Sequence, residues 1–316
     1  MRFVAALVAA TLLLAGLAGC SDGADSNGAA APPTSEATAS SPPTPTAAAT
    51  IDAAVGLQAQ HVAALAKLAA AAQEAAGRLD PVPSRDGPVL GADISWPQCP
   101  PGMGIPHKIS SGQPMPRDDA EYVVIGLTNG PGFHANPCLA DQVAWAKGRG
   151  LLVAAYSVIS WPDEAAQQEY GGLQKAGRAQ AEFNLASMKA AGLESPIVWL
   201  DVESVPFYDW STDISANAEV VLGAAQGYVE AGYRIGVYST PAIWAGIVGD
   251  LSLGAPEWRA AGQTSRAEAE SRCGPDWSIQ GGKAVLAQWV EDSRDRNVTC
   301  PGAETTLGGY FTTTDP

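Results

Sequence analysis

Two acidic residues, Asp201 and Glu203, end an otherwise apolar stretch that begins at Ile197. Side chains alternate between the faces of a strand, so Trp199, Asp201 and Glu203 share one face and aliphatic residues fill the other. Two carboxyls this close disfavour each other's ionisation, which retains one proton near neutral pH. A protonated carboxyl beside a charged one is what glycosidic cleavage requires. We therefore predict Glu203 as the general acid, with Asp201 orienting the substrate or stabilising developing charge.

A third acid, Asp93, stands near the end of another apolar run, which leads to Trp96. The carboxyl ends of parallel strands meet at one edge, where working residues lie in α/β folds. Alone, the Asp201-x-Glu203 pattern also fits a cation site, a helix cap or an ion pair with arginine. Three acids at one mouth raise each other's cost of ionising, which proteins tolerate mainly at functional sites. We predict Asp93, Asp201 and Glu203 as catalytic.

Aromatic residues near strand ends are candidates for contacts with a sugar, although most tryptophans of a barrel belong to its core. Trp96 and Trp161 each follow a predicted strand and precede a proline, and we predict both as glycan contacts. No GxSxG follows a predicted strand, as a nucleophile elbow requires, and the sequence has no GxxxxGK[ST] loop, no GxGxxG after a strand and no HExxH. These absences argue against serine-hydrolase, nucleotide and zinc-protease chemistry, and we expect no cofactor and no metal.

The elements that must position these residues follow from the hydrophobic pattern. Continuous apolar runs, typical of parallel strands covered on both faces, occur at Leu90–Ser95, Tyr122–Thr128, Leu151–Val158, Pro196–Glu203, Arg234–Thr240, Pro256–Gly262 and Val285–Val290. Helices are predicted between them at Asn136–Arg149, Asp163–Ala191, Ile214–Ala231 and Pro241–Val248. Residues 251–316 look loop-rich with short strands. We therefore expect an α/β fold over residues 86–316, a modified TIM-type barrel of about five β/α units followed by helix-poor strands.

The first residues have the pattern of a lipoprotein signal peptide. The apolar run from Phe3 to Leu17 is shorter than the ~20 residues that a membrane-spanning helix needs. It leads into Leu17-Ala18-Gly19-Cys20, a lipobox pattern, and the chain turns polar at once. We predict a signal peptide over 1–19, lipidation of Cys20, and export to the outer face of the cytoplasmic membrane or the cell envelope. The alternative is an ordinary secretory signal with a chance cysteine.

Composition indicates how the rest is organised. Residues 20–50 are Ala, Ser, Thr, Pro and Gly with few large apolar side chains, which predicts a disordered tether, and residues 51–85 predict an Ala-rich helix and a Pro-rich linker. The net charge of −15 argues against binding of nucleic acid and against a basic grip on anionic lipid. The partners we expect are a cell-wall polysaccharide and the membrane, the latter through the lipid on Cys20, with the chain a monomer.

Four cysteines remain once Cys20 is set aside: Cys99, Cys138, Cys273 and Cys300. An even number in an oxidising compartment predicts disulfides, and three connectivities are possible. We favour Cys99 with Cys138 and Cys273 with Cys300, because each pair is close in sequence. A zinc site is disfavoured, since no pair has CxxC spacing and the three histidines are scattered.

Five motifs together resemble the glycoside hydrolase family 25 lysozymes and, more closely, the glycoside-hydrolase-like barrel domain of exported bacterial proteins of unassigned activity. They are Gly91-Ala92-Asp93-Ile94-Ser95-Trp96-Pro97-Gln98-Cys99, Asn136-Pro137-Cys138-Leu139, Trp199-Leu200-Asp201-Val202-Glu203, Gly236-Val237-Tyr238-Ser239-Thr240 and Ala287-Gln288-Trp289. The resemblance implies N-acetylmuramidase activity on peptidoglycan, with Asp93, Asp201 and Glu203 as its acids. Asp295-Arg296-Asn297 is similar to the family's terminal Asp-x-Asn. We therefore add Tyr238, Gln288 and Asp295 as substrate contacts. Whether the substrate's acetamido group or a direct displacement supplies the nucleophile stays open.

Two functions are compatible with these residues. The first is a membrane-tethered glycosidase that acts on peptidoglycan or a related cell-wall glycan, and it draws on the three acids. The second is a lipoprotein on the same barrel that binds cell-wall glycan without cleaving it or serves envelope structure. It draws on the disulfides and on the Pro-rich loop Pro100–Pro116, which stands where a first helix is expected and is placed to cover the cleft.

Overall fold

The computed structural model describes residues 82–314 and, before them, Ala64, Lys67, Leu68, Ala70 and Glu74. The predicted signal peptide, Cys20 and the tether lie outside the described residues. These five positions are helical. Leu68 is buried in the apolar cluster that lies between the strands and the helices. In the part of the chain that is described, no helix has both the length and the apolar character needed to cross a membrane.

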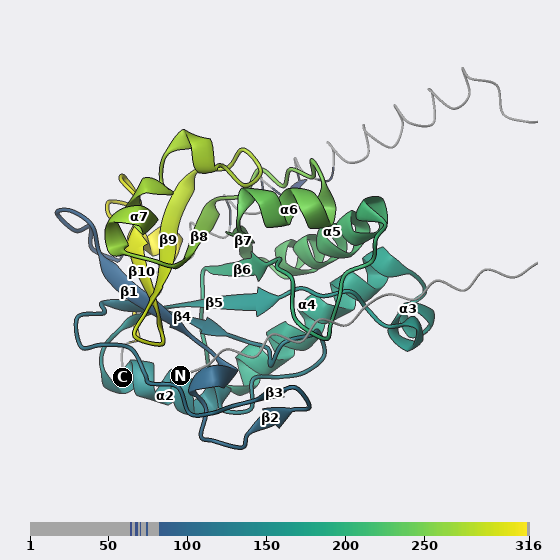
Figure 1. Ribbon diagram of the computed structural model, residues 1–316, viewed down its shortest axis with the longest axis horizontal. Helices are drawn as coiled ribbons and strands as arrows, with labels where there is room; N and C mark the ends of the chain where they lie inside the picture. The colour runs from purple at the N-terminus through teal and green to yellow at the C-terminus, as the bar shows by residue number, and fades with distance from the viewer. Residues whose placement is uncertain (1–63, 65–66, 69, 71–73, 75–81, 315–316) are drawn as a thin grey trace, which may run out of the picture. The chain divides into compact units, whose positions relative to one another are not determined.

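Eight strands close into a barrel in the order β1-β10-β9-β8-β7-β6-β5-β4 (Figure 1). They are β1 (Leu90–Ile94), β4 (Tyr122–Gly126), β5 (Leu152–Val158), β6 (Ile197–Asp201), β7 (Arg234–Ser239), β8 (Glu257–Gln263), β9 (Ala284–Glu291) and β10 (Arg294–Thr299). Seven of these strands run parallel, whereas β10 is antiparallel to both β1 and β9. The expected α/β barrel is confirmed. The strand β10 was not predicted, because its sequence begins with the charged residues Arg-Asp-Arg.

Helices follow the strands from β4 onward and become short toward the C-terminal part. They are α2 (Leu139–Gly148), α3 (Glu164–Tyr170), α4 (Leu173–Ala190), α5 (Ile214–Glu230), α6 (Pro241–Val248) and α7 (Arg266–Ser271). Figure 1 shows α4 and α5 packed side by side against the barrel, while α7 lies beside β8, β9 and β10. This arrangement agrees with the expected helix-poor second part.

The single helix predicted over Asp163–Ala191 is wrong, because the structure has two helices in this range, α3 and α4. Gly171 ends α3 at φ 76° and Gly172 precedes α4 at φ 124°, backbone conformations that side-chain-bearing residues rarely adopt. Asp163 caps α3 by accepting a hydrogen bond of 2.8 Å from the backbone N–H of Ala166. The break turns the chain between two helices that a continuous pattern of polar and apolar residues had joined.

Two apolar layers hold the barrel and place the acids of β6. Val198, Leu200 and Val202 belong to the outer layer beneath the helices, as expected from alternation. Trp199 belongs to a second cluster inside the barrel, where its ring meets Trp258 at a centroid distance of 6.1 Å. The inner face of β6 therefore carries Trp199 below and an acid above it.

The loop between β1 and β4 carries a small hairpin in place of a helix, formed by β2 (Gly104–Ile105) and β3 (Lys108–Ile109). A short 3₁₀ helix, η1 (Trp96–Gln98), leads from β1 into it. Both predicted disulfides are present, Cys99–Cys138 and Cys273–Cys300. The first connects this loop to the start of α2, so it anchors the hairpin to the barrel.

Candidate active site

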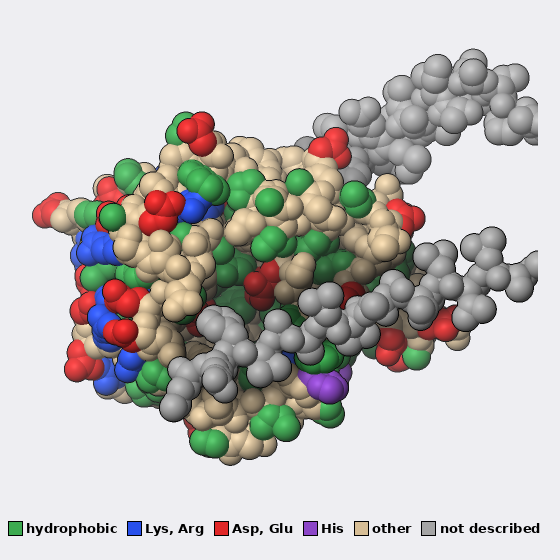
Figure 2. Space-filling model, viewed as in Figure 1, with side chains coloured by type: hydrophobic (Ala, Val, Ile, Leu, Met, Phe, Trp, Pro, Cys, Tyr) green, Lys and Arg blue, Asp and Glu red, His purple; other side chains and the backbone are tan. Residues whose placement is uncertain are grey.

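A cleft with a volume of about 440 Å³ opens at the carboxyl ends of the parallel strands. Four acids line it: Asp93 from β1, Asp201 from the end of β6, Glu203 just after that strand, and Asp295 from β10. Figure 2 shows acidic side chains inside a hollow whose walls are largely apolar. The three acids that the sequence predicted as catalytic thus converge in one open cleft, and the predicted contact Asp295 joins them.

Asp93 is fixed by two side-chain amides from the neighbouring part of the barrel. Its Oδ1 accepts hydrogen bonds from Nε2 of Gln288 at 3.0 Å and from Nδ2 of Asn297 at 2.7 Å. Burial raises the pKa of Asp93 well above its ordinary value, Asp295 raises it further, and the two amides lower it. Asp93 is therefore an immobile carboxyl that retains a proton more strongly than an exposed aspartate.

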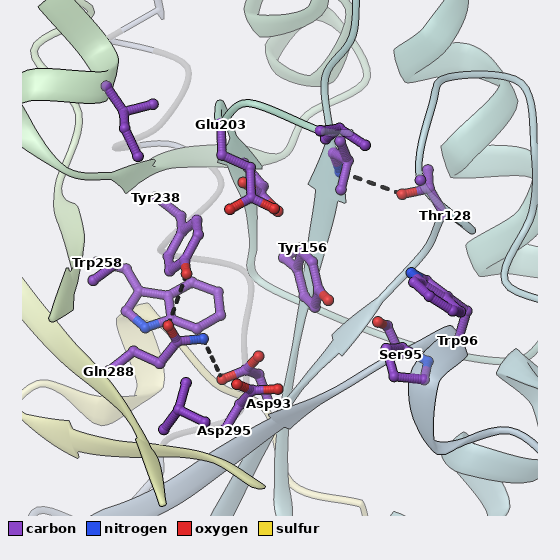
Figure 3. Close-up of a pocket in the computed structure, with 18 of the residues that line it drawn as sticks. Asp93, Ser95, Trp96, Thr128, Tyr156, Glu203, Tyr238, Trp258, Gln288 and Asp295 are labelled. Carbon is purple, nitrogen blue, oxygen red and sulfur yellow. Dashed lines mark hydrogen bonds between the residues drawn. The ribbon is translucent and has the colours of Figure 1, made fainter. Parts of the chain in front are cut away.

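The amide of Gln288 is itself oriented by a hydroxyl group. Tyr238 donates a hydrogen bond of 2.7 Å to Oε1 of Gln288, so the Gln288 amide must present its N–H to Asp93 (Figure 3). The ring of Tyr238 packs on Trp258 at a centroid distance of 4.5 Å, and Trp258 donates from Nε1 to Asn297. These five side chains, from β1, β7, β8, β9 and β10, form one connected floor of the cleft.

Asp201 lies deep in the cleft, whereas Glu203 lies nearer its rim. Oδ1 of Asp201 is buried and has no hydrogen-bond partner among the described residues. Burial raises the pKa of Asp201 well above its ordinary value, Glu203 and Asp93 raise it further, and Lys108 lowers it. Burial likewise raises the pKa of Glu203, against the lowering effect of Lys108. The Glu203 backbone is held in place, since its carbonyl accepts a hydrogen bond of 2.9 Å from Nε1 of Trp210.

Asp295 stands opposite this pair, beside Asp93 at the floor (Figure 3). Burial raises its pKa to about 6. Neighbouring carboxyls that share so confined a space cannot all ionise near neutral pH. The cleft therefore combines a proton donor with a charged carboxyl, which is the requirement for acid-assisted cleavage of an acetal.

Several residues of the cleft were not predicted from the sequence. Lys108 reaches it from the β2–β3 hairpin, Tyr156 stands in its middle, and Trp258 and Asn297 support its floor. Tyr156 carried a usable signal, because alternation along β5 places it on the inward face with Leu152 and Ala154. Asn297 carried a signal in the Asp295-Arg296-Asn297 motif, although it was not named as a site residue. Lys108 carried none, since the hairpin was not foreseen.

The predicted glycan contacts divide into two groups. Trp96, Tyr238, Gln288 and Asp295 line the cleft. Trp161 does not: it is partly buried and packs against the outer apolar layer. The chain beyond β5 turns Trp161 toward the helices. In the described ranges no group of His, Cys, Asp or Glu side chains is arranged to hold a metal ion.

Comparisons with known protein sequences find matches to lysozyme-like proteins. Residues 167–272 match the profile of a family described as Lysozyme-like protein 1. A probable GH family 25 lysozyme 3 of Dictyostelium discoideum is 30% identical over 183 residues, 55% of this chain and 34% of that protein. A probable GH family 25 lysozyme 4 of the same organism is 41% identical over 66 residues, 20% of this chain and 30% of that protein. The chain thus spans about a third of the length of these curated relatives. Together these matches point to a glycoside hydrolase family 25-like fold.

Solved structures with a similar fold include a muramidase from Acremonium alcalophilum, with 18% identity and a TM-score of 0.48 over 70% of this chain and 99% of that one. Another is a family GH25 lysozyme from Aspergillus fumigatus, with 19% identity and a TM-score of 0.46 over 70% of this chain and 98% of that one. A bacterial lysozyme from Streptomyces coelicolor has 16% identity and a TM-score of 0.47 over 71% of this chain and 97% of that one.

Proposed function

We propose that this protein is a muramidase-like hydrolase of cell-wall peptidoglycan or a related wall glycan, held at the membrane surface by a lipid on Cys20. The observation that carries the proposal is the convergence of Asp93, Asp201, Glu203 and Asp295 in one cleft. None of the residues lining this cleft is an arginine, and its one cation, Lys108, forms no ion pair with these acids. The names of the relatives, which are lysozymes, support the same chemistry.

Glu203 is assigned as the general acid because its position and its proton affinity both suit that role. It lies nearer the rim than Asp201, and burial raises its pKa, so the side chain keeps a proton that a glycosidic oxygen needs on leaving. Once the bond has broken, the Glu203 carboxylate can take a proton from the incoming water. The same side chain thus serves as acid in the first half of the reaction and as base in the second.

Asp201 is assigned to the sugar's reacting end. Its buried Oδ1, which lacks a partner among the described residues, is suited to accept the N–H of an acetamido group. That contact would turn the acetamido oxygen toward the anomeric carbon, so that this oxygen can attack as the glycosidic bond breaks. Direct attack by Asp201 on the anomeric carbon is the competing route. Asp93, held by two amides, fixes the floor against which the sugar is placed.

The test is an assay of the full-length protein on purified cell wall, with release of reducing ends as the readout. Glu203→Gln should lower release by roughly 10²- to 10⁴-fold, the usual contribution of general acid–base catalysis. Glu219→Gln, a change of the same type at an exposed position of α5, is the matched control and should release at the unaltered rate. Equal release by the Glu203→Gln protein would remove Glu203 as the acid.

The same assay addresses the second function. Binding of the wall without release by the unaltered protein would replace the hydrolase by the non-catalytic glycan-binding lipoprotein. Anchoring is tested separately, by labelling cells with a fatty acid. The Cys20→Ala protein should carry no label and should no longer be found in the membrane fraction. Retention of label in that variant would overturn the anchor at Cys20.

A further inference from the structure

Lys108 is the one cationic side chain among the residues that line the acidic cleft. It comes from β3 of the hairpin that replaces the expected first helix, on the side of the cleft formed by Trp96 and Gly130. Facing it are the acids of the β6 end, Asp201 and Glu203. No step of the mechanism above uses this residue, and its position calls for an explanation.

The side chain is held along its whole length. The backbone carbonyl of Lys108 accepts a hydrogen bond of 3.0 Å from Nδ2 of Asn129. Its aliphatic part lies over Gly130, where an added Cβ would fall 2.2 Å from Cδ of Lys108, and its Nζ lies 5.3 Å from the centre of the Trp96 ring. A lysine on an open surface has no such support, so the ammonium is directed to one place in the cleft.

The ammonium is placed but not paired. Within the described residues, its Nζ makes no hydrogen bond, and no carboxylate oxygen lies within the 4.0 Å of an ion pair. Glu203 and Asp201 act on it only at longer range, and both raise its pKa against the lowering effect of its partial burial. The three N–H donors of the ammonium are therefore free for an acceptor that enters the cleft.

We propose that Lys108 is a specificity-determining residue that binds a carboxylate carried by the glycan, beside Trp96. An anionic ligand would otherwise meet only acids here, because the other ionisable lining groups are Asp93, Asp201, Glu203, Asp295 and tyrosines. A neutral glycan would need no fixed cation at this position. The inference rests on the proposed function, because it takes the ligand to be a wall glycan. It adds that the Lys108 ammonium distinguishes a glycan with a carboxylate from an uncharged one.

Two sources within peptidoglycan carry this chemistry, the lactyl carboxylate of a muramic acid freed of its peptide and the carboxylates of the peptide stems. The experiment therefore uses four probes: intact peptidoglycan, peptide-free glycan strands, the same strands after methyl esterification, and chitin oligosaccharides. Each is tested for binding to full-length protein carrying Glu203→Gln, and for release of reducing ends by the protein with Glu203 intact. Lys108→Met is compared in both backgrounds, with Lys189→Met on the exposed face of α4 as the matched control.

Lys108→Met should weaken binding and kcat/KM on carboxylated strands by roughly ten- to a hundredfold, as loss of a charged hydrogen bond does. On esterified strands and on chitin oligosaccharides it should change binding by no more than about twofold. Any fall in kcat/KM there should be smaller than on carboxylated strands and should come from the higher pKa of Glu203 and Asp201 once the ammonium is lost. Lys189→Met should change nothing on any probe. A loss confined to intact peptidoglycan would assign the peptide carboxylates, and a loss on peptide-free strands the lactyl group.

An equal loss on carboxylated and esterified strands would overturn the proposal, as would the absence of a loss on both intact peptidoglycan and peptide-free strands. A shift of the pH profile without a change in preference would also overturn it, because Lys108 would then act only as a counter-charge for the acids. Failure of the proposed function is distinguishable, because the unaltered protein would then release no reducing ends. The difference in binding between carboxylated and esterified strands would still test the role of Lys108. Thermal unfolding of each variant checks that the hairpin change leaves the barrel folded.

Discussion

Asn297 donates a hydrogen bond of 2.7 Å from its side-chain amide to Oδ1 of Asp93. The two residues lie on β10 and β1, the last and first strands of the barrel, whose antiparallel pairing closes it. The carbonyl oxygen of the same Asn297 amide accepts the Nε1 hydrogen of Trp258. One side chain thus contributes both to closure of the barrel and to the floor of the cleft.

Asn297→Ala should therefore damage stability and activity together. The change leaves the buried Nε1 of Trp258 without its acceptor and Asp93 with one donor fewer. Each unsatisfied group should lower the unfolding free energy by about 1–3 kcal/mol. Urea denaturation measures the first effect and release of reducing ends the second. Asn184→Ala is the control, since Asn184 bonds Ser157 and Tyr228 away from the cleft. Full release by folded Asn297→Ala protein would contradict the role of this contact.

Tyr238→Phe tests the hydroxyl group that orients Gln288. Without the hydroxyl, the Gln288 amide loses the hydrogen bond of 2.7 Å that fixes which end faces Asp93. Release should fall by roughly tenfold, while unfolding free energy changes by less than about 1.5 kcal/mol. Tyr228→Phe, which removes a buried hydroxyl bonded to Ser157 outside the cleft, should lower stability by a similar amount and leave release unchanged. The opposite pattern between the two variants would disprove the assignment.

Asp295 gives the protein a specific dependence on pH. Its pKa in the folded state is about 6, above the ordinary 3.8, so the folded state binds the proton more tightly than the unfolded one. The stabilising contribution is complete below pH 3.8 and is lost as pH rises through about 6. Unfolding free energies measured between about pH 4 and pH 7 should fall more steeply for the unaltered protein than for Asp295→Asn.

An Asp250→Asn protein, altered at an exposed position after α6, is the control for loss of one charge, and it should follow the unaltered protein across this range. Parallel curves for Asp295→Asn and the unaltered protein would show that Asp295 does not hold its proton as inferred. The comparison reports Asp295 together with its effect on Asp93 and Glu203, because Asp295 raises the pKa of both.

The two disulfides should be separable by function. Removing either by paired alanine substitutions should lower unfolding free energy by about 3–4 kcal/mol, since they close loops of 39 and 27 residues. Loss of Cys99–Cys138 should also reduce release, because Cys99 lies between η1 and the hairpin that carries Lys108. Loss of Cys273–Cys300 should leave release by the folded protein nearly unchanged. Equal effects on release would show that the first bridge has no special part in placing the hairpin.

The sequence was sufficient where a buried parallel strand dictates the side-chain pattern. In β6 the aliphatic residues Val198 and Leu200 must face the helices, which leaves Asp201 on the inner face beside Trp199. The same logic placed Asp93 at the end of β1, and both carboxyls line the cleft. Alternation is a local property, so it can be read without knowledge of the tertiary contacts.

The sequence was insufficient where tertiary contacts override the local preference for secondary structure. The strand β10 pairs on both sides and buries Arg296 over Trp289 and against Asp119, so a polar segment becomes part of the barrel. The hairpin depends on its disulfide and on Asn129, which are distant in sequence. Lys108 and Asn297 entered the site through these two elements. Trp161 lies outside the cleft for a related reason, because the direction of a side chain beyond a strand end is set by what packs against it.

The antiparallel insertion of β10 between β1 and β9 also decides when the cleft first exists. Asp93 belongs to the first strand of the barrel and Asp295 to the last, so a chain emerging from its N-terminus presents Asp93, Asp201 and Glu203 long before they have a common floor. A chain without β10 has neither the closed barrel nor the Asn297 amide that holds Asp93, so assembly of the cleft waits for the strand that begins at Arg294.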